Sequence, residues 1–133
     1  MTDLTGAVQL ALDAALSVVP GLPPVVSEVP IDDKGQPIYP FTLLGDDQVT
    51  DVGGKHSRLE RHEVAVHVCM QEVSKLEVRA KQELVRAALV DQPLTAPGAI
   101  LSTPDQLNMS TPLLEDGATY VGVNTFLIYA QPA

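Results

Sequence analysis

Several features that build disulfide scaffolds, membrane spans or leaders are scarce in this 133-residue sequence. Cys69 is the single cysteine, which excludes an internal disulfide. With three Tyr, two Phe and no Trp, the core must be filled by Leu, Val and Ala. No apolar run approaches the roughly 18 residues that a helix needs to cross a bilayer, and the N-terminus lacks a basic leader region. We therefore expect neither a membrane span nor a secretory signal.

Positive charge is also scarce. Eight Lys and Arg face 17 Asp and Glu, so the formal net charge is −9. A protein that binds duplex DNA normally shows a basic stripe, because neutralising phosphates supplies much of its affinity. Half of the basic residues lie between Lys75 and Arg86, interleaved with Glu. We expect no direct nucleic-acid binding; an acidic surface suits solubility, a basic partner, or a lumen past which DNA slides.

Motifs for catalysis and metal binding are missing too. The sequence contains no phosphate-cradling glycine loop, nucleophile elbow or HExxH pattern. His67 and Cys69 fall on one face of a predicted strand, but a metal site needs at least a third ligand. His62 falls on the opposite face and His56 in a loop. The favoured interpretation is a half-buried histidine beside a buried thiol, so we expect no enzyme and no cofactor or metal.

What is present predicts a single α+β domain over residues 1–133, because the length and the 45% hydrophobic content support one core. A helix is expected over residues 5–19, ended by Pro20 and Gly21. A second helix, over 74–90, opens with the capping box Ser74-Lys75-Leu76-Glu77. The expected core face of the first helix is Leu4, Val8, Ala11, Leu12, Ala15, Leu16 and Val19; that of the second is Leu76, Ala80, Leu84, Ala87 and Ala88, joined by Val85 and Leu89.

The strands are predicted from alternation and turn residues. Residues 61–70 alternate strictly between apolar and mostly polar positions, and we expect them to pair with a strand over 39–44. A C-terminal hairpin over 107–129 turns at Glu115-Asp116-Gly117. Residues 45–59 are polar and glycine-containing, which predicts a mobile loop. The expected architecture is a largely antiparallel sheet with both helices packed on one face.

Two groups of charged residues are candidates for an assembly interface. The first lies in the 45–59 loop, where the aspartates are either a weak divalent-cation site or simply solvated. The second lies on the 74–90 helix, where the charges form either its solvated face or a contact with an acidic neighbour. The candidates are Asp46, Asp47, Asp51, Lys55, Arg58, Lys75, Arg79 and Arg86.

The order of four segments resembles the phage tail-completion, or tail terminator, family, which includes the lambda U-type ring proteins. The segments are Val-Val-Ser-Glu-Val-Pro at 25–30, Tyr-Pro-Phe-Thr-Leu-Leu-Gly-Asp-Asp at 39–47, His-Glu-Val-Ala-Val-His-Val at 62–68 with the capped helix after it, and the hairpin ending Tyr-Val-Gly-Val-Asn-Thr-Phe at 120–126. The resemblance covers nearly the whole chain. Residues 32–36 look like a short insertion, and the first strand lacks the aromatic–aspartate pair often seen in the family.

The resemblance implies a structural protein of a phage, prophage or gene transfer agent particle. Such a protein forms a homo-oligomeric ring, a hexamer, on the head-proximal end of the tail tube and joins it to the head connector. Its partners are then the tail tube protein and the head completion protein, with genomic DNA passing through the lumen unbound. Two alternatives are a head-side adaptor or stopper ring and, more distantly, a small-molecule-binding module, which would need a concave pocket with convergent polar groups.

Overall fold

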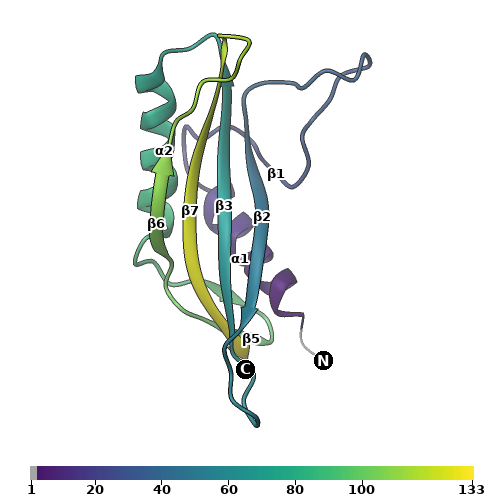
Figure 1. Cartoon of the computed structure of the whole chain (residues 1–133), viewed down its shortest axis with the longest axis vertical. Coiled ribbons are helices and arrows are strands. Elements are labelled where there is room, and N and C mark those ends of the chain that lie inside the picture. The colour runs from purple at the N-terminus through teal and green to yellow at the C-terminus, as the bar shows by residue number, and fades with distance from the viewer. Residues whose placement is uncertain (1–2) are drawn as a thin grey trace.

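Three long antiparallel strands form the middle of the molecule (Figure 1): β2 (Phe41–Asp51), β3 (Glu60–Gln71) and β7 (Thr119–Pro132). The computed structural model describes residues 3–133, so the first two residues of the expected domain lie outside it. The sheet order is β1-β2-β3-β7-β5-β4, with β6 also paired to β7. The short strands are β1 (Val25–Val26), β4 (Thr95–Ala96), β5 (Ala99–Leu101) and β6 (Asp105–Ser110). The β1–β2 pair is parallel, which makes the sheet mixed.

Strict alternation in β3 places one set of its side chains in the core, as predicted. These side chains pair across the strands with the buried residues of β7, for example Val64 with Phe126 and His62 with Ile128. Both helices, α1 (Leu4–Ser17) and α2 (Lys75–Leu89), contribute to the same hydrophobic cluster as these strands. The α+β class and the single domain are confirmed; the finer expectation that both helices pack on one face stays a prediction.

The first helix follows its predicted stripe closely. Asp3 caps it, since its Oδ1 accepts a hydrogen bond from the Gly6 amide at 2.9 Å. The helix ends at Ser17, two residues before the expected end, and Val18 is its C-cap. Its buried residues are Leu4, Ala7, Val8, Ala11, Leu12 and Leu16. No helix within residues 3–133 is long and apolar enough to cross a membrane.

The predicted core face of the second helix was right in part: Val85 and Leu89 are buried, but the start of the stripe was wrong. Ser74 caps it as expected, accepting from the Glu77 amide at 3.2 Å, but Leu76 is 80% exposed, and Ala80 and Ala87 are exposed too. The buried residues are Val78 and Gln82, which were not predicted, together with Val85 and Leu89. The stripe is displaced because a polar side chain, Gln82, finds hydrogen-bond partners inside the fold, which a count of apolar residues does not reveal.

The predicted 45–59 loop was also wrong. Residues 47–51 pair with 60–64 of β3, so the strand expected over 39–44 runs on to Asp51, and the turn is only 52–59. A register shift between Leu44 and Asp47 bends the strand. This half of β2 looked like a loop because most of its side chains are polar and exposed. The C-terminal hairpin is present, with β7 continuing to Pro132, and the strand expected over 61–70 gains one residue at each end.

Candidate assembly surface

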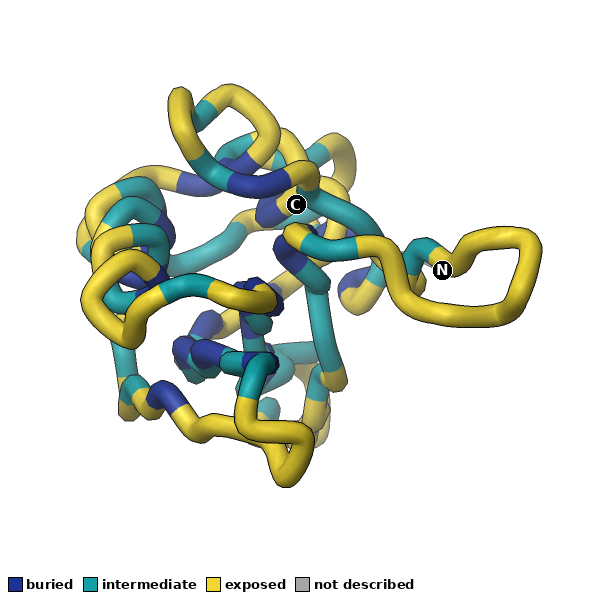
Figure 2. The backbone as a smooth tube through the Cα atoms, turned by 90° about the horizontal axis from the view of Figure 1, so that it is seen from above, coloured by how far each residue is buried: buried dark blue, intermediate teal, exposed yellow. Residues whose placement is uncertain are grey.

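One segment protrudes from the body of the protein. Residues 27–38 form an arm beyond β1 (Figures 1 and 2), closed by a bridge between Ile31 and Pro37. Its turn is held by Asp32, whose Oδ1 accepts from the Lys34 amide at 2.8 Å. Ile31 is 62% and Ile38 50% exposed. Large apolar side chains grouped on a projection are typical of a contact with another protein.

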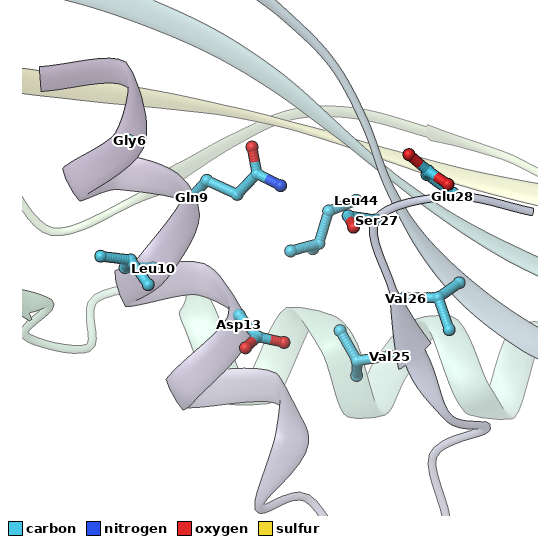
Figure 3. Close-up of a pocket in the computed structure, with 9 residues that line it drawn as sticks. All are labelled: Gly6, Gln9, Leu10, Asp13, Val25, Val26, Ser27, Glu28 and Leu44. Atoms are coloured by element: carbon cyan, nitrogen blue, oxygen red, sulfur yellow. The ribbon is translucent and has the colours of Figure 1, made fainter. Parts of the chain in front are cut away.

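A groove of about 680 Å³ lies between the first half of α1 and β1 (Figure 3). Its apolar lining includes Leu10, which is 63% exposed, and Leu44. Both charged side chains in the lining, Asp13 and Glu28, are acidic. The complete lining is Gly6, Gln9, Leu10, Asp13, Val25, Val26, Ser27, Glu28 and Leu44. The groove is therefore partly apolar and negatively charged.

The groove lies beside the point where β1 stops pairing with β2 and the edge of the sheet becomes unpaired. Strand β1 pairs with β2 only through Thr42 and Leu43. Residues 44–51 pair with β3 on one side, and within residues 3–133 no strand pairs with their other side. An unpaired edge carries free amide and carbonyl groups that accept a strand from another chain. This edge and the groove form one continuous candidate surface, because Leu44 belongs to both.

The three candidate aspartates, Asp46, Asp47 and Asp51, do not come together at one site. The Asp47 carboxylate contacts Nδ1 of His62 at 2.9 Å, whereas Asp51 accepts from the Gly53 amide at 3.0 Å. Asp46 is exposed and acts electrostatically on His67. Among residues 3–133, no group of three or more His, Cys, Asp or Glu side chains is placed to hold a metal ion. The structure thus assigns these aspartates different roles.

A buried polar cluster was not anticipated from the sequence. His62 is fully buried, and its Nδ1 faces Asp47 while its Nε2 contacts Glu60 at 3.1 Å. Arg58 completes the cluster through Glu60 at 3.1 Å. Both imidazole contacts are hydrogen bonds only when both ring nitrogens carry hydrogen. The cluster joins the bulged half of β2 to β3; the sequence signal for it is two polar residues, Glu60 and His62, at core positions of one strand.

The turn between β2 and β3 forms a basic tip. Residues 52–59 contain Lys55 and Arg58 and no Asp or Glu. Lys55 and His56 are exposed, and Val52 is 45% exposed. Arg58 is half-buried and paired with Glu60, so it supports the buried cluster as well as the tip. Figure 1 places this tip at the lower end of the sheet.

The helix candidates form a separate surface. Lys75 is exposed, Arg79 is half-buried, and Nη1 of Arg86 lies 3.9 Å from Glu83. This helix contacts β7, β6 and β3 (Figure 1), whereas the tip and the open edge belong to β2. The eight candidate residues therefore divide between two regions. Leu76, the most exposed large apolar side chain, lies at the start of the same helix.

His67 and Cys69 lie on the strand face opposite to His62. Burial lowers the pKa of His67 below its ordinary value, and the charge of Asp46 opposes this shift. Burial raises the pKa of the Cys69 thiol to about 11. The thiolate, which is the reactive form, is therefore a very small fraction at neutral pH. This environment fits a structural thiol, in agreement with the interpretation from the sequence.

Comparison with known proteins supplies the identification. A sequence model of the family described as "Tail completion protein gp17" matches residues 7–131. The chain belongs to this family. It is therefore a structural protein of phage tails, and the resemblance seen in the sequence is confirmed. A search of curated proteins finds no match.

A solved structure shows the same fold. A chain from the structure titled "Virion of native gene transfer agent (GTA) particle" aligns with a TM-score of 0.85 at 19% sequence identity. The alignment covers 98% of this chain and 99% of that chain. The fold is thus shared over nearly the whole length of both chains.

Proposed function

We propose that this tail completion protein is a tail terminator: a ring, six-fold, that caps the head-proximal end of the tail tube in the virion. Membership of the tail completion family over residues 7–131 carries this proposal. The cap stops tube polymerisation because one ring face matches the tube end while the other does not match a further tube ring. That second face then receives the head completion protein.

The distribution of surfaces supports ring formation. The groove with the open β2 edge, the outer arm at residues 31–38 and the basic tip are different parts of the chain, so contacts between copies can be head-to-tail rather than self-complementary. Head-to-tail contacts close into a ring when the rotation between neighbours permits. The charged candidates Asp46, Asp51, Lys55, Lys75, Arg79 and Arg86 belong to these contacts or to those with the tube and head.

The charge of the chain supports passage of DNA. A formal net charge of −9 disfavours binding to phosphates, so a lumen lined by this protein lets the genome slide through. The same argument makes a direct DNA-binding role unfavourable. No catalytic step is part of the proposal, since the cap acts by shape and affinity.

Deletion of the gene from the particle that encodes it, followed by electron microscopy of the lysate, tests the proposal. We expect overlong tails that are not joined to heads, with normal particles restored by the wild-type gene in trans. Tails of normal length beside filled heads would instead identify a head-side adaptor or stopper. Normal infectious particles after deletion would contradict both roles.

A further inference from the structure

The groove beside α1 needs an occupant whose charge and shape match it. Its two charged side chains, Asp13 and Glu28, are acidic, and Leu10 leaves an apolar surface at its side. The open edge of β2 begins at Leu44 in the same groove. An occupant therefore needs positive charge, an apolar side chain and a backbone able to lie along a strand edge.

This chain contains one segment with those properties. Residues 52–59 read Val-Gly-Gly-Lys-His-Ser-Arg-Leu, which is basic in a chain of net charge −9. Val52 is 45% exposed, and the exposed Lys55 stands at the tip of the turn. Gly53 and Gly54, which precede Lys55, add little side-chain bulk to the turn. No other stretch of eight residues in the sequence holds two Lys or Arg without an Asp or Glu.

The arm is a poorer match. It carries apolar side chains, but Glu28, Asp32 and Asp33 outweigh Lys34, so its net charge is negative. Like charges at close range oppose association. Charge complementarity thus selects the basic tip over the arm as the occupant of the groove.

Tip and groove do not meet within one copy. The groove lining contains no residue of 52–59, and Figure 1 shows the tip at the lower end of the sheet, below α1 and β1. A contact between them therefore joins two copies, and because the two surfaces differ, it is head-to-tail.

We infer that the basic tip of one copy, residues 52–59, docks in the acidic groove of the next copy. The Lys55 ammonium lies against Asp13 and Glu28, Val52 packs towards Leu10, and the tip runs beside the open edge of β2. Repeated around the axis, this contact builds the ring. The inference rests on the proposed function and specifies the contact between its subunits.

Cysteine cross-linking in assembled particles tests the inference. A chain with Leu10→Cys and Lys55→Cys replaces the wild type, particles are purified and oxidised, and the products are separated without reductant. We expect a ladder of cross-linked multiples of 14.2 kDa. The native Cys69 stays silent because it is buried and its thiol pKa is about 11. The matched control, Leu10→Cys with Lys34→Cys on the arm, should stay monomeric.

Particles that contain the doubly substituted chain at normal level but show only monomer would overturn the inference while leaving the terminator role intact. If wild-type particles contain no copy of this chain, the proposed function fails instead. In that case the same cross-linking is done on the concentrated purified chain. A ladder then supports the contact between tip and groove, and monomer alone refutes it.

A charge exchange gives a second, independent measurement. Lys55→Glu and Asp13→Lys should each lower the yield of joined particles at least about tenfold, since like charges then meet at the contact. The double variant should recover most of the yield. Loss in both single variants without recovery in a folded double variant would place the partner of the tip outside the groove, on the tube or head protein.

Discussion

At the scale of the residue, the amide of Gln82 determines how α2 lies on the sheet. Its Nε2 donates to the Ser110 carbonyl and to Oδ1 of Asn124, both at 2.9 Å. Its Oε1 accepts from the Thr111 hydroxyl at 2.7 Å. Nδ2 of Asn124 in turn donates a hydrogen bond to the backbone carbonyl of Gln82 at 3.1 Å. A buried amide with every group paired holds a helix in one position, because any displacement would leave polar atoms unpaired.

Gly122 lies directly beneath this amide, so Gly122→Ala should destabilise the fold. The added Cβ would lie 2.5 Å from Cδ of Gln82, whose side chain is held at both ends. We expect a loss of about 1–3 kcal/mol in the free energy of unfolding, measured with urea. The control is Gly54→Ala, where the nearest atom is Ser57 Oγ at 3.6 Å. Wild-type stability of Gly122→Ala would mean that the Gln82 side chain can move aside.

His67 should make stability depend on pH. Burial lowers its pKa in the folded state, with Asp46 opposing the shift. The unfolded chain therefore takes up a proton at higher pH than the folded chain, and stability falls as pH drops from about 6.5 towards the folded pKa. His67→Gln should reduce this slope in urea unfolding curves taken across that range. The control His56→Gln removes an exposed histidine; equal slopes in wild type and His67→Gln would disprove the assignment.

At the scale of the element, the half of β2 beyond its bulge has one neighbouring strand, β3, among the described residues 3–133. It is held to β3 by its hydrogen-bond ladder and by the cluster of Asp47, His62 and Glu60. Without a strand on its outer side, this half of β2 relies on that cluster for its position. The cluster therefore keeps the open edge and the basic tip in place for contact with another chain.

Asp47→Ala should weaken this element much more than the neighbouring substitution Asp46→Ala. Loss of the Asp47 carboxylate leaves Nδ1 of the fully buried His62 without its acceptor. We expect a decrease of about 1–3 kcal/mol in the free energy of unfolding at pH 7, against less than about 0.5 kcal/mol for the exposed Asp46. Amide hydrogen exchange should also rise in residues 47–51. Equal effects of the two substitutions would argue against the cluster as an anchor.

At the scale of the whole molecule, one core carries two projections, the arm and the basic tip (Figure 1). Every residue from 31 to 38 is exposed, so the outer arm adds nothing to the core. Its exposed isoleucines therefore do not support the fold. An exposed segment that adds nothing to the core is what we expect of a protein that functions through contacts with other chains.

Replacing residues 32–36 by Gly-Gly should therefore change assembly without changing the fold. We expect the free energy of unfolding to stay within about 0.5 kcal/mol of wild type, because no buried contact is lost. Complementation of a gene deletion should fail, since the arm then presents Ile31 and Ile38 differently. Full complementation by this variant would show that the arm is not part of an assembly contact.

The sequence alone determined most of the element types and the family. Alternation in β3, the stripe of α1 and the capping box of α2 depend on local backbone geometry, so neighbouring residues are enough to predict them. The order of the segments was enough for the resemblance, which the family match over residues 7–131 confirms. Lys55 and Arg58 of the basic tip were among the candidate interface residues, although the sequence did not separate them from the aspartates before them.

Only the tertiary structure decided which polar residues are buried and where the candidate site lies. Gln82 is in the core because Asn124, 42 residues further along the chain, supplies its partner. The groove combines Leu10, Val25 and Leu44 from three elements. Residues 47–51 form a strand because 60–64 supply a ladder. Burial of a polar group depends on partners distant in sequence, and local periodicity carries no information about them.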